Sequence, residues 1–586
     1  MILKSNKLNL EIGLTITALL LLFNLSGSGQ GLTISSGTIL FAPAGNIVLQ
    51  GNVTNNGSWV NQNSTVIFSG NTQILNGTYP ISFNNIIVAP GGTTTITTSG
   101  QSLAGILLCN STLNSNGNLT LLSSDSRTAI IDGSGTGEVN GKVTMQRYLS
   151  SGFGYKYFSS PFKGATVSEF GDEIDLGAYF PMLFRYDESR TSSGWVRYTD
   201  PGGKLNPMEG YSVNFGSMTE PKTADLSGEV NNGNLSLPLY NHNNAFTTGF
   251  NLVGNPYPSP IDWDAPEGWT RTNIDDAIYY FKASNTDQYG GTYSTYLDGV
   301  SSDGLATSII PSMQGFFVHV TDGLWPVEGS LALNNDVRKI NLTQPFVKSG
   351  SKGAISYVRF EAGYSDNAES FDPAVIYLDP NATCDFDGKY DAYKILGNDS
   401  NKTNFYTFGC DSSMLSINCL PSAGDDPYRV RLGLKTEKDA DIIFRIRDLL
   451  VDFPYRYISI LDVVTGVNQD LLNGHEYRIN LKTGHYQHRF YLILSDALKT
   501  TIDHIPGDDG FNVYSSRGIL KVEISLPITG SGILTIYNLL GQAIFQYKIP
   551  GPGSYEFDPA IKDGIYIVTF RTGNREIPKR IFIREN

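Results

Sequence analysis

The residues best suited to chemistry lie in a proline-rich segment, where Asp262 and Asp264 flank Trp263. Alternate side chains of an extended backbone share a face, so the two carboxylates could serve as the acid and base of a glycosidase. Such carboxylates usually come from different elements, about 5–10 Å apart, so an adjacent pair is weak evidence. Trp263 and Trp269 form a candidate platform for stacking a sugar ring. Packing of both indoles in a core is the leading interpretation.

A second candidate is the segment Asp385-Phe-Asp-Gly-Lys-Tyr-Asp391, which alternates oxygen ligands around a glycine. Asp385, Asp387 and Asp391 are candidate ligands for a structural calcium ion, although the segment lacks the spacing and the final Glu of an EF-hand. Otherwise we expect no cofactor. His485 and His488 lie in a strand-like run, where an offset of three puts the rings on opposite faces, so a shared metal is not expected.

Four cysteines occur, at positions 109, 384, 410 and 419, and their spacing does not match a zinc site. Cys109 follows the apolar run Gly105-Ile-Leu-Leu and is expected to be a small buried hydrophobe. A disulfide between Cys384 and Cys410 is one candidate, and a disulfide between Cys410 and Cys419 competes with it.

No linear motif of a nucleophile elbow, a zinc protease, a P-loop or a dinucleotide fold is present, and helical periodicity is almost absent. We therefore expect no enzymatic activity. The net charge is -14 and no basic cluster occurs, which argues against a nucleic-acid partner.

The elements that hold these residues are expected to be strands throughout. Residues 31–124 contain no Asp, Glu, Lys, Arg or His, and short β-branched runs there alternate with Gly and Asn turns. In a β-solenoid, side chains repeat at the strand spacing of about 4.8 Å, so like charges in register would repel, whereas Asn and Thr can hydrogen-bond. Residues 31–141 are therefore predicted to form a β-solenoid-like repeat region.

The rest of the chain is predicted to contain two β-sandwiches, at 142–335 and 336–497, because many short alternating strands are separated by turn signals. Residues 498–510 are polar and rich in turn formers, as linkers are. A final unit covers residues 511–586. The predicted fold class is thus all-β: a solenoid-like region, two sandwiches and an immunoglobulin-like C-terminal sandwich.

The N-terminus has the pattern of a secretory signal peptide over residues 1–29. Lys4 and Lys7 precede an apolar run from Ile12 to Leu25, and small residues follow. The run is shorter than the roughly 20 residues of a membrane span. No cysteine lies near the expected cleavage before Gln30, so lipid attachment there is not expected.

The C-terminal unit shows seven strand patterns in 76 residues, the number expected of an immunoglobulin-like sandwich. The predicted strands are residues 511–514, 520–525, 533–537, 543–547, 554–557, 565–571 and 575–583.

Three ordered motifs of this unit resemble the type A sorting domain of the Bacteroidetes type IX secretion system: Ile536-Tyr-Asn-Leu-Leu-Gly-Gln542, Asp563-Gly-Ile-Tyr-Ile-Val568 and the basic strand Lys579-Arg-Ile-Phe-Ile583. The family usually opens with an Asn-Pro turn, and this chain has Val513-Tyr-Ser-Ser516 instead. The residues that match the sorting motifs are Tyr537, Asn538, Leu540, Gly541, Gln542, Gly564, Ile565, Tyr566, Lys579 and Arg580.

The resemblance implies export in two steps. The Sec translocon would use the N-terminal signal, and an outer-membrane type IX translocon would recognise the folded C-terminal unit. A sortase would then remove the tag, and the protein would be anchored to surface lipopolysaccharide or released outside the cell. Phrases such as Phe250-Asn-Leu-Val-Gly-Asn-Pro-Tyr-Pro-Ser-Pro260 and Gln314-Gly-Phe-Phe-Val318 also resemble cargo proteins of this system.

We therefore expect a secreted or surface-anchored, adhesin-like structural protein that contacts glycans, host or other surfaces. The alternatives are a surface carbohydrate-binding protein and a β-sandwich glycan hydrolase.

Overall fold

The computed structural model describes residues 31–342, 355–422, 427–450, 453–496, 511–516, 519–524, 531–559, 561–562, 564–573 and 575–583. These residues form strands with only short 3-10 helices, so the predicted all-β class is confirmed. None of their helices is long and apolar enough to cross a membrane. The expected signal peptide and the linker 498–510 lie outside the described residues. The chain divides into two compact units, residues 1–351 with 397–399 and residues 352–396 with 400–586, which are described separately.

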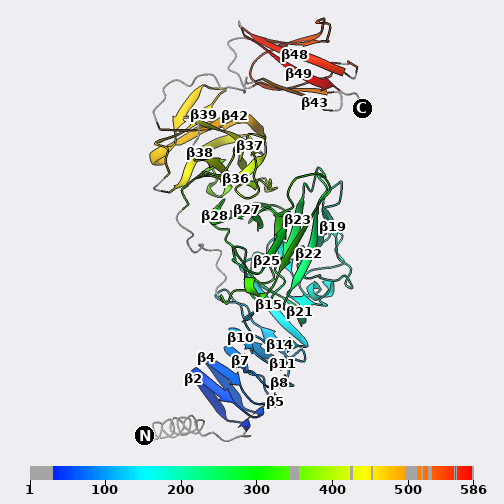
Figure 1. The fold of residues 1–586 in the computed structure, drawn as a ribbon, viewed down its shortest axis with the longest axis vertical. Coiled ribbons are helices and arrows are strands. Elements are labelled where there is room, and N and C mark those ends of the chain that lie inside the picture. The colour runs from blue at the N-terminus through cyan, green and yellow to red at the C-terminus, as the bar shows by residue number, and fades with distance from the viewer. Residues whose placement is uncertain are drawn as a thin grey trace. The chain divides into compact units, whose positions relative to one another are not determined.

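The N-terminal part of the first unit is a solenoid with three parallel sheets, drawn in blue in Figure 1. The first coils alternate between two of the sheets, and from β5 onward successive strands pass through all three sheets in turn. The first sheet contains β1 (Leu32–Ile34), β3 (Val53–Asn55), β5 (Thr72–Gly77), β8 (Thr93–Ile96), β11 (Thr112–Asn114) and β14 (Glu138–Asn140). The second contains β2 (Ile39–Leu49), β4 (Ser58–Phe68), β7 (Asn85–Val88), β10 (Ile106–Cys109) and β13 (Ile130–Ile131). The third contains β6 (Ser82–Phe83), β9 (Gln101–Leu103), β12 (Leu119–Leu121) and β15 (Lys142–Leu149).

Apolar side chains fill the inside of the coils in columns. Val88 pairs in register with Phe68 on one side and Cys109 on the other, and all three are buried. Cys109 is a free thiol at 3% exposure, as expected of a small core residue, and burial raises its pKa. The solenoid is therefore stabilised by stacking the same kind of residue coil upon coil.

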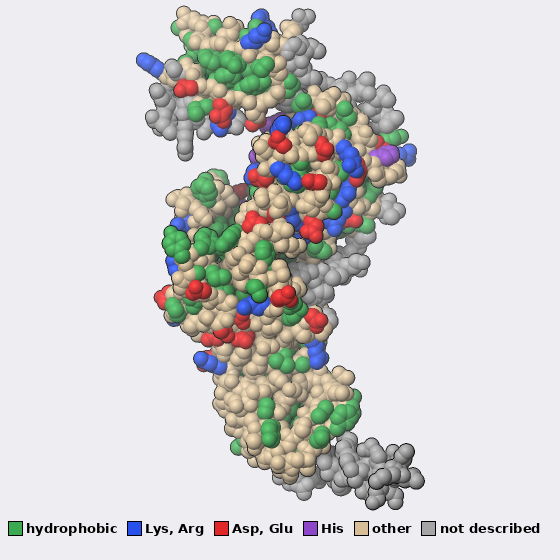
Figure 2. Space-filling view, turned by 180° about the vertical axis from the view of Figure 1, so that it is seen from behind, with side chains coloured by type: hydrophobic (Ala, Val, Ile, Leu, Met, Phe, Trp, Pro, Cys, Tyr) green, Lys and Arg blue, Asp and Glu red, His purple; other side chains and the backbone are tan. Residues whose placement is uncertain are grey.

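Neutral polar side chains link successive coils on the outside. The Asn85 amide donates to Thr65 Oγ1 at 3.4 Å and accepts from the backbone N–H of Ile106 at 2.9 Å, over separations of 20 and 21 residues. Ser102 donates to Ser82 at 3.0 Å in the same way. A charge at these positions would face its neighbour along the ladder. Figure 2 shows this part of the molecule almost free of red and blue side chains.

The predicted boundary at residue 142 is not a break in the structure. Strand β15 pairs in parallel with β12 of the solenoid and, on its other edge, antiparallel with β21 (Lys222–Val230). The third sheet thus continues into the following region and ends with β17 (Phe162–Lys163). A single hydrophobic core extends from the solenoid into this region, because the sheet is continuous.

The remainder of the first unit consists of short antiparallel sheets. One contains β16 (Tyr155–Ser159), β20 (Gly210–Asn214), β18 (Leu183–Tyr186) and β19 (Trp195–Arg197); another contains β23 (Phe250–Gly254), β30 (Gly315–His319), β26 (Ile278–Ala283), β27 (Gly291–Leu297) and β28 (Val300–Ser301). A third contains β22 (Leu235–Asn241), β31 (Val327–Leu333) and β25 (Trp269–Thr272), and β24 (Ile261–Asp262) pairs with β29 (Ile309–Ile310). Two 3-10 turns, η2 (Val167–Phe170) and η3 (Asn335–Val337), complete the region.

The first part of the second unit is one 11-stranded sheet. Its strands are β32 (Tyr357–Tyr364), β33 (Asp372–Asp379), β34 (Ala392–Tyr393), β35 (Asn404–Phe408), β36 (Met414–Pro421), β37 (Tyr428–Thr436), β38 (Ala440–Leu449), β39 (Tyr457–Asp462), β40 (Val467–Asp470), β41 (Glu476–Leu481) and β42 (Gly484–Ser495). The short turns η4 (Ala368–Ser370) and η5 (Leu472–Gly474) connect some of them.

This sheet folds over onto itself. In the sheet order, β38 lies six strands from β42, a path of about 29 Å in a flat sheet at the usual spacing of about 4.8 Å. The rings of Phe444 on β38 and Phe490 on β42 are nevertheless only 4.8 Å apart. A sandwich of two separate sheets was expected here, and the structure instead has both layers in one continuous sheet around a shared core.

The C-terminal part of the second unit is a sandwich of seven strands, and every predicted strand is present. One sheet contains β43 (Phe511–Ser516), β44 (Ile519–Ile524) and β47 (Gly553–Phe557), and the other contains β46 (Ala543–Ile549), β45 (Gly532–Tyr537), β48 (Gly564–Thr572) and β49 (Arg575–Ile583). The rings of Phe511 and Phe570, from opposite sheets, stack at 5.5 Å in the common core.

Candidate functional site

A pocket of about 490 Å³ opens in the first unit where several sheets end. Residues of β18, β20, β22 and β23 line it, together with the polar side chains of Asp187, Glu188, Glu209 and His242. Glu188 follows the end of β18 and His242 follows the end of β22, so the turns after these strands bring the two side chains together. The ring of Tyr240, 40% exposed, lies on the same wall.

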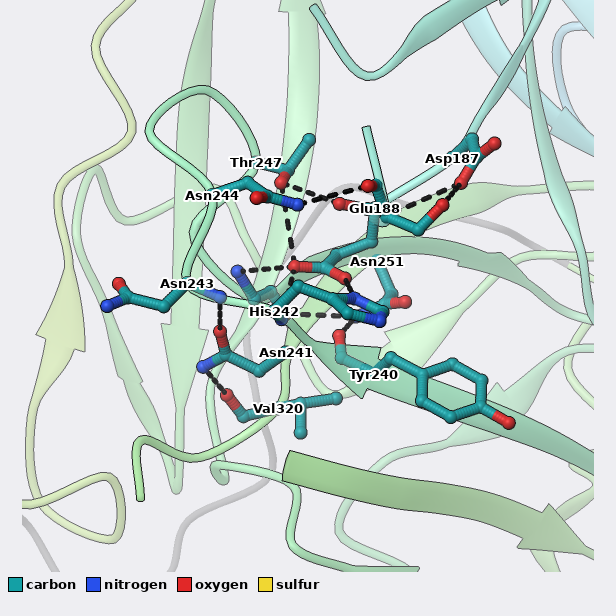
Figure 3. A network of polar contacts seen from close by, with 12 residues as sticks. Asp187, Glu188, Tyr240, Asn241, His242, Asn243, Asn244, Thr247, Asn251 and Val320 are labelled. Carbon is teal, nitrogen blue, oxygen red and sulfur yellow. Dashed lines mark hydrogen bonds and ion pairs between the residues drawn. The ribbon is translucent and has the colours of Figure 1, made fainter. Parts of the chain in front are cut away.

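The Glu188 carboxylate is the centre of a polar network (Figure 3). Its Oε1 accepts hydrogen bonds from the backbone N–H of His242 at 3.0 Å and of Gly249 at 3.3 Å. Its Oε2 lies 2.5 Å from His242 Nδ1. The Glu188 side chain is only 3% exposed, so these donors replace the water that a buried carboxylate needs.

Neighbouring amides and a hydroxyl hold the loop that carries this network (Figure 3). Thr247 Oγ1 donates to the Glu188 carbonyl at 2.7 Å. The Asn251 amide donates to the carbonyls of Tyr240 and Gly249, both at 2.9 Å. Because each turn is tied to the next by side-chain bonds, the position of the imidazole is fixed before any ligand arrives.

The chemistry of the pocket follows from the orientation of His242. A carboxylate only accepts hydrogen bonds, so we assign the ring proton to Nδ1, which leaves Nε2 as an acceptor. The ring is 33% exposed and lines the pocket. In the described part of the chain, no Ser, Thr or Cys side chain hydrogen-bonds His242, so the geometry provides a fixed acceptor for a polar ligand and no paired nucleophile.

A second histidine and carboxylate form a buried pair in the same unit. His319 Nδ1 lies 2.6 Å from Asp275 Oδ2, and both side chains are 2% exposed. His319 Nε2 contacts the Thr248 carbonyl at 2.9 Å. A carbonyl only accepts, so Nε2 carries a proton and a further proton lies between Nδ1 and the carboxylate. Since no solvent reaches this pair, we assign it a structural role.

The predicted sorting motif between β45 and β46 is a turn organised by one side chain. Asn538 Oδ1 accepts from the backbone N–H groups of Leu540 and Gln542, each at 3.0 Å, and its Nδ2 donates to Gln542 Oε1 at 2.9 Å. Gly541 has a φ of 79°, which glycine adopts without strain. The turn exposes Leu539 by 68% and Leu540 by 85%.

The neighbouring strands extend this apolar surface. Ile565 and Ile567 point to the same side of β48 and are 43% and 37% exposed. Arg580, opposite Ile567 in the register, belongs to the edge strand β49, as does Lys579. Tyr537 pairs with Ile567, and Gly564 and Tyr566 lie on β48. The motif residues thus share one four-stranded sheet, and Figure 2 shows green side chains on a face of this C-terminal part.

The prediction that Trp263 forms part of a platform for stacking a sugar ring is wrong. This indole is 1% exposed in the core, where its Nε1 donates to the Asp276 carbonyl at 2.7 Å and the Arg271 guanidinium covers it at 3.7 Å. A ring that is enclosed on all sides offers no face to a sugar. Trp269 is half-buried and packs its edge on Trp263 at 4.9 Å.

The two carboxylates beside Trp263 have separate partners. Asp262 forms an ion pair with Lys339 at 3.2 Å, whereas Asp264 accepts a hydrogen bond from the Tyr296 hydroxyl. Each carboxylate therefore has a structural contact that accounts for its position.

The predicted calcium ligands are not gathered around one point. Asp391 is buried, and its two oxygens accept from the backbone N–H groups of Asp387 at 2.8 Å and Cys419 at 2.7 Å. Burial raises the pKa of Asp391 to about 7. Among the described residues, the cluster with metal-ligand spacing is instead Cys384, Asp385 and Cys410.

That cluster is already used by a covalent bond. Cys384 and Cys410 form a disulfide, one of the two pairings that the sequence left open, and Cys419 is a free buried thiol. A disulfide has no thiolate to bind a metal. The geometry therefore does not favour a calcium loop at these residues.

Sequence reasoning missed the Glu188–His242 pair, because 54 residues separate the two and no linear motif joins them. The signal that was present is local: the run Asn241-His-Asn-Asn244 places polar residues directly after a strand. Turns of this composition are typical places for binding residues.

Together, the fold and these sites define an all-β protein with a neutral solenoid, polar pockets and a separate C-terminal sandwich. A family model for a domain of unknown function, DUF8693, matches residues 48–494, and the chain belongs to this family. The match runs from the end of β2 into β42, so it includes the solenoid and both middle regions and stops before the C-terminal sandwich. No curated protein matches the chain.

Proposed function

We propose that this protein is exported through a type IX pathway and acts outside the cell as an adhesin-like structural protein, without turnover. The observation that carries this proposal is the Asn538 turn with its two exposed leucines, on a C-terminal sandwich that lies beyond the family match. Large apolar side chains at 68% and 85% exposure cost free energy in water, so they favour a docking role.

In the proposed route, the folded C-terminal sandwich is the export signal that the outer-membrane translocon recognises. The Sec translocon would act on the N-terminal signal. The outer-membrane translocon would bind the Leu539–Leu540 turn, the apolar side of β48 and the basic edge strand β49. After the sortase has cut within residues 498–510, the remaining chain would be attached to lipopolysaccharide or released. The solenoid and the middle regions would then make the contacts with glycans or other surfaces.

The proposal is tested by mass spectrometry of the protein recovered from the surface and medium of its native host. We expect peptides that end between residues 498 and 510 and none from residues 511–586. A mature surface protein that retains Ile583 would overturn the proposal.

Paired variants test the turn itself. Replacement of Leu539 and Leu540 by Ser should leave the protein in the periplasm, because the translocon would lose its apolar contact. The control is Leu324→Ser, in the first unit, which removes a leucine that is even more exposed (97%) and should not alter export. Normal export of the double variant would contradict the assigned role of the turn.

The pocket of Glu188 and His242 favours carbohydrate binding as a second function. A fixed imidazole acceptor beside the exposed ring of Tyr240 suits a ligand with hydroxyl groups and a flat apolar face. A glycan array with the full chain should give signals that His242→Ala removes. An array without signal, or one unchanged by the substitution, would exclude this function. A glycan hydrolase is the remaining alternative, and an activity screen in which Asp262→Ala and Asp264→Ala leave turnover intact would remove these two carboxylates as catalytic candidates.

A further inference from the structure

A second cavity of the first unit, about 480 Å³ in volume, has a wall of unusual charge. It is enclosed by the loop 124–128, the end of β15, the start of β16 and the end of β26. Four cations line it, namely Arg127, Arg147, Lys156 and Lys282, against the single carboxylate of Asp125. The whole chain carries a net charge of -14, so a cavity with a positive wall departs from the composition around it.

Lys156 is the clearest member of this wall. Its ammonium donates to the Phe153 carbonyl at 2.6 Å, and within the described residues no carboxylate forms an ion pair with it. Burial lowers the pKa of Lys156 to about 8, so the group is still mainly protonated at neutral pH. A desolvated cation beside a neutral carbonyl is stabilised further by an anion.

The other three cations differ in whether their positive charge is already neutralised by a nearby carboxylate. Lys282 forms an ion pair with Asp303 at 2.8 Å, while Arg127 donates to the neutral Asn84 amide at 3.1 Å. Arg147 donates to the Ser312 carbonyl at 3.2 Å, and burial lowers its pKa to about 10, which leaves it charged. Asp125 is exposed at the rim. Arg127 and Lys156 therefore give the wall of the cavity a positive excess.

The remaining wall offers hydroxyl groups and amides. Eight Ser, Thr, Asn and Gln residues also line the cavity. They are Ser124, Ser126, Thr128, Ser150, Ser151, Ser284, Asn285 and Gln314. Such a wall suits a ligand that combines an anionic group with a hydroxyl-bearing ring.

We infer that this cavity binds an acidic sugar, with a carboxylate or sulfate group held by Lys156 and the ring lying among the hydroxyl and amide side chains. This assignment is independent of the export proposal, because it uses only residues of the first unit. It also differs from the pocket of Glu188 and His242, which is lined by carboxylates and a single arginine.

The test is calorimetric titration of the full chain carrying His242→Ala, which removes the imidazole of the other pocket, with four probes: glucuronate, galactose 6-sulfate, glucose and inorganic sulfate. We expect saturable binding of at least one acidic sugar below about 10 mM and none of glucose. Preference for glucuronate or for the sulfated sugar identifies which anionic group is recognised. No binding of either acidic sugar, or equal binding of glucose, would overturn the inference. Inorganic sulfate that binds as tightly as the sugars would show an anion site without sugar recognition and would also overturn it.

Variants of Lys156 connect binding to the cavity. Lys156→Gln should weaken binding about tenfold, the loss expected for one charge-assisted hydrogen bond, whereas Lys156→Arg should retain most of it. Lys204→Gln removes an exposed lysine elsewhere in the unit and is the matched control. A thermal unfolding curve for each variant shows whether it is folded. Unchanged affinity in folded Lys156→Gln would contradict the assignment.

The pH dependence supplies a further readout. Affinity should fall as pH rises above about 8 and Lys156 loses its proton, and this fall should be absent in Lys156→Arg. The other charged or titratable groups that line the cavity are Asp125, Arg127, Arg147, Tyr148, Tyr157 and Lys282. Since these groups are present in both proteins, a fall that persists in Lys156→Arg would refute the role of Lys156.

Discussion

The network around Glu188 allows a quantitative prediction from the difference between two substitutions. Both backbone N–H donors, from His242 and Gly249, reach the same oxygen, Oε1, while Oε2 serves the imidazole. Glu188→Ala removes the acceptor of both buried N–H groups, at about 1–3 kcal/mol each, and should destabilise the first unit by about 2–6 kcal/mol. The imidazole adds little to this loss, because its ring is 33% exposed and can bind water.

Glu188→Gln should cost far less. The amide oxygen can still accept from both N–H groups, and only the charge on the bond to His242 is lost, which is worth about 1 kcal/mol. The imidazole then faces an amide N–H and should change its tautomer. The informative result is therefore the difference between the unfolding free energies of Glu188→Ala and Glu188→Gln, rather than the value for either variant alone.

The assay is urea unfolding followed by tryptophan fluorescence. All five tryptophans of the chain lie in the first unit, so the signal reports on that unit alone. Trp195 is the local probe, since its ring lies 5.0 Å from Tyr186, at the end of β18. Glu220→Ala, at an exposed position, is the control and should change stability by less than about 0.5 kcal/mol. If Glu188→Ala costs under about 1 kcal/mol, or if Gln costs as much as Ala, the reasoning is refuted.

Three further predictions concern the core, the disulfide and a buried acid. Leu107→Ala should destabilise the solenoid by about 2–5 kcal/mol in the same fluorescence assay, because Leu107 is fully buried between coils; a loss below about 1 kcal/mol would contradict the stacked core. Replacement of Cys384 and Cys410 by Ser should cost about 3 kcal/mol, since the bond closes a separation of 26 residues, and an unchanged melting curve by circular dichroism would count against it. Burial raises the pKa of Asp391 from 3.8 to about 7, so the folded chain binds this proton more tightly than the unfolded chain. The free energy of unfolding should therefore fall by about 2–4 kcal/mol as the pH rises from 4 to 7. Urea midpoints measured by circular dichroism should show this slope in the native chain and not in Asp391→Asn.

Patterns within a single strand were predictable because they depend on local geometry. The seven C-terminal strands were all located from the alternation of side chains, which shows directly which face of a strand is buried. The solenoid was predictable from the absence of charge over residues 31–124, since in-register stacking penalises a repeated charge. The pairing of β15 on both edges was not predictable, because pairing partners are set by the whole sheet.

Side-chain roles that depend on distant partners could not be predicted. Asp262, Trp263 and Asp264 looked like a site by adjacency, yet packing encloses the indole and gives each carboxylate its own partner. Glu188 and His242 carry no shared motif, and only the ends of two strands bring them together.

The sequence by itself thus determined the all-β class, the neutral solenoid and the C-terminal strands, because strand periodicity and the repulsion of stacked charges act over neighbouring residues and coils. Only the tertiary structure decided that β15 joins the solenoid to the next region, that one sheet folds back to bring Phe444 onto Phe490, and that Arg147, Lys156 and Lys282 surround one cavity. The physical reason is that burial and charge compensation depend on which surfaces meet in space, and residues far apart in the chain supply those surfaces.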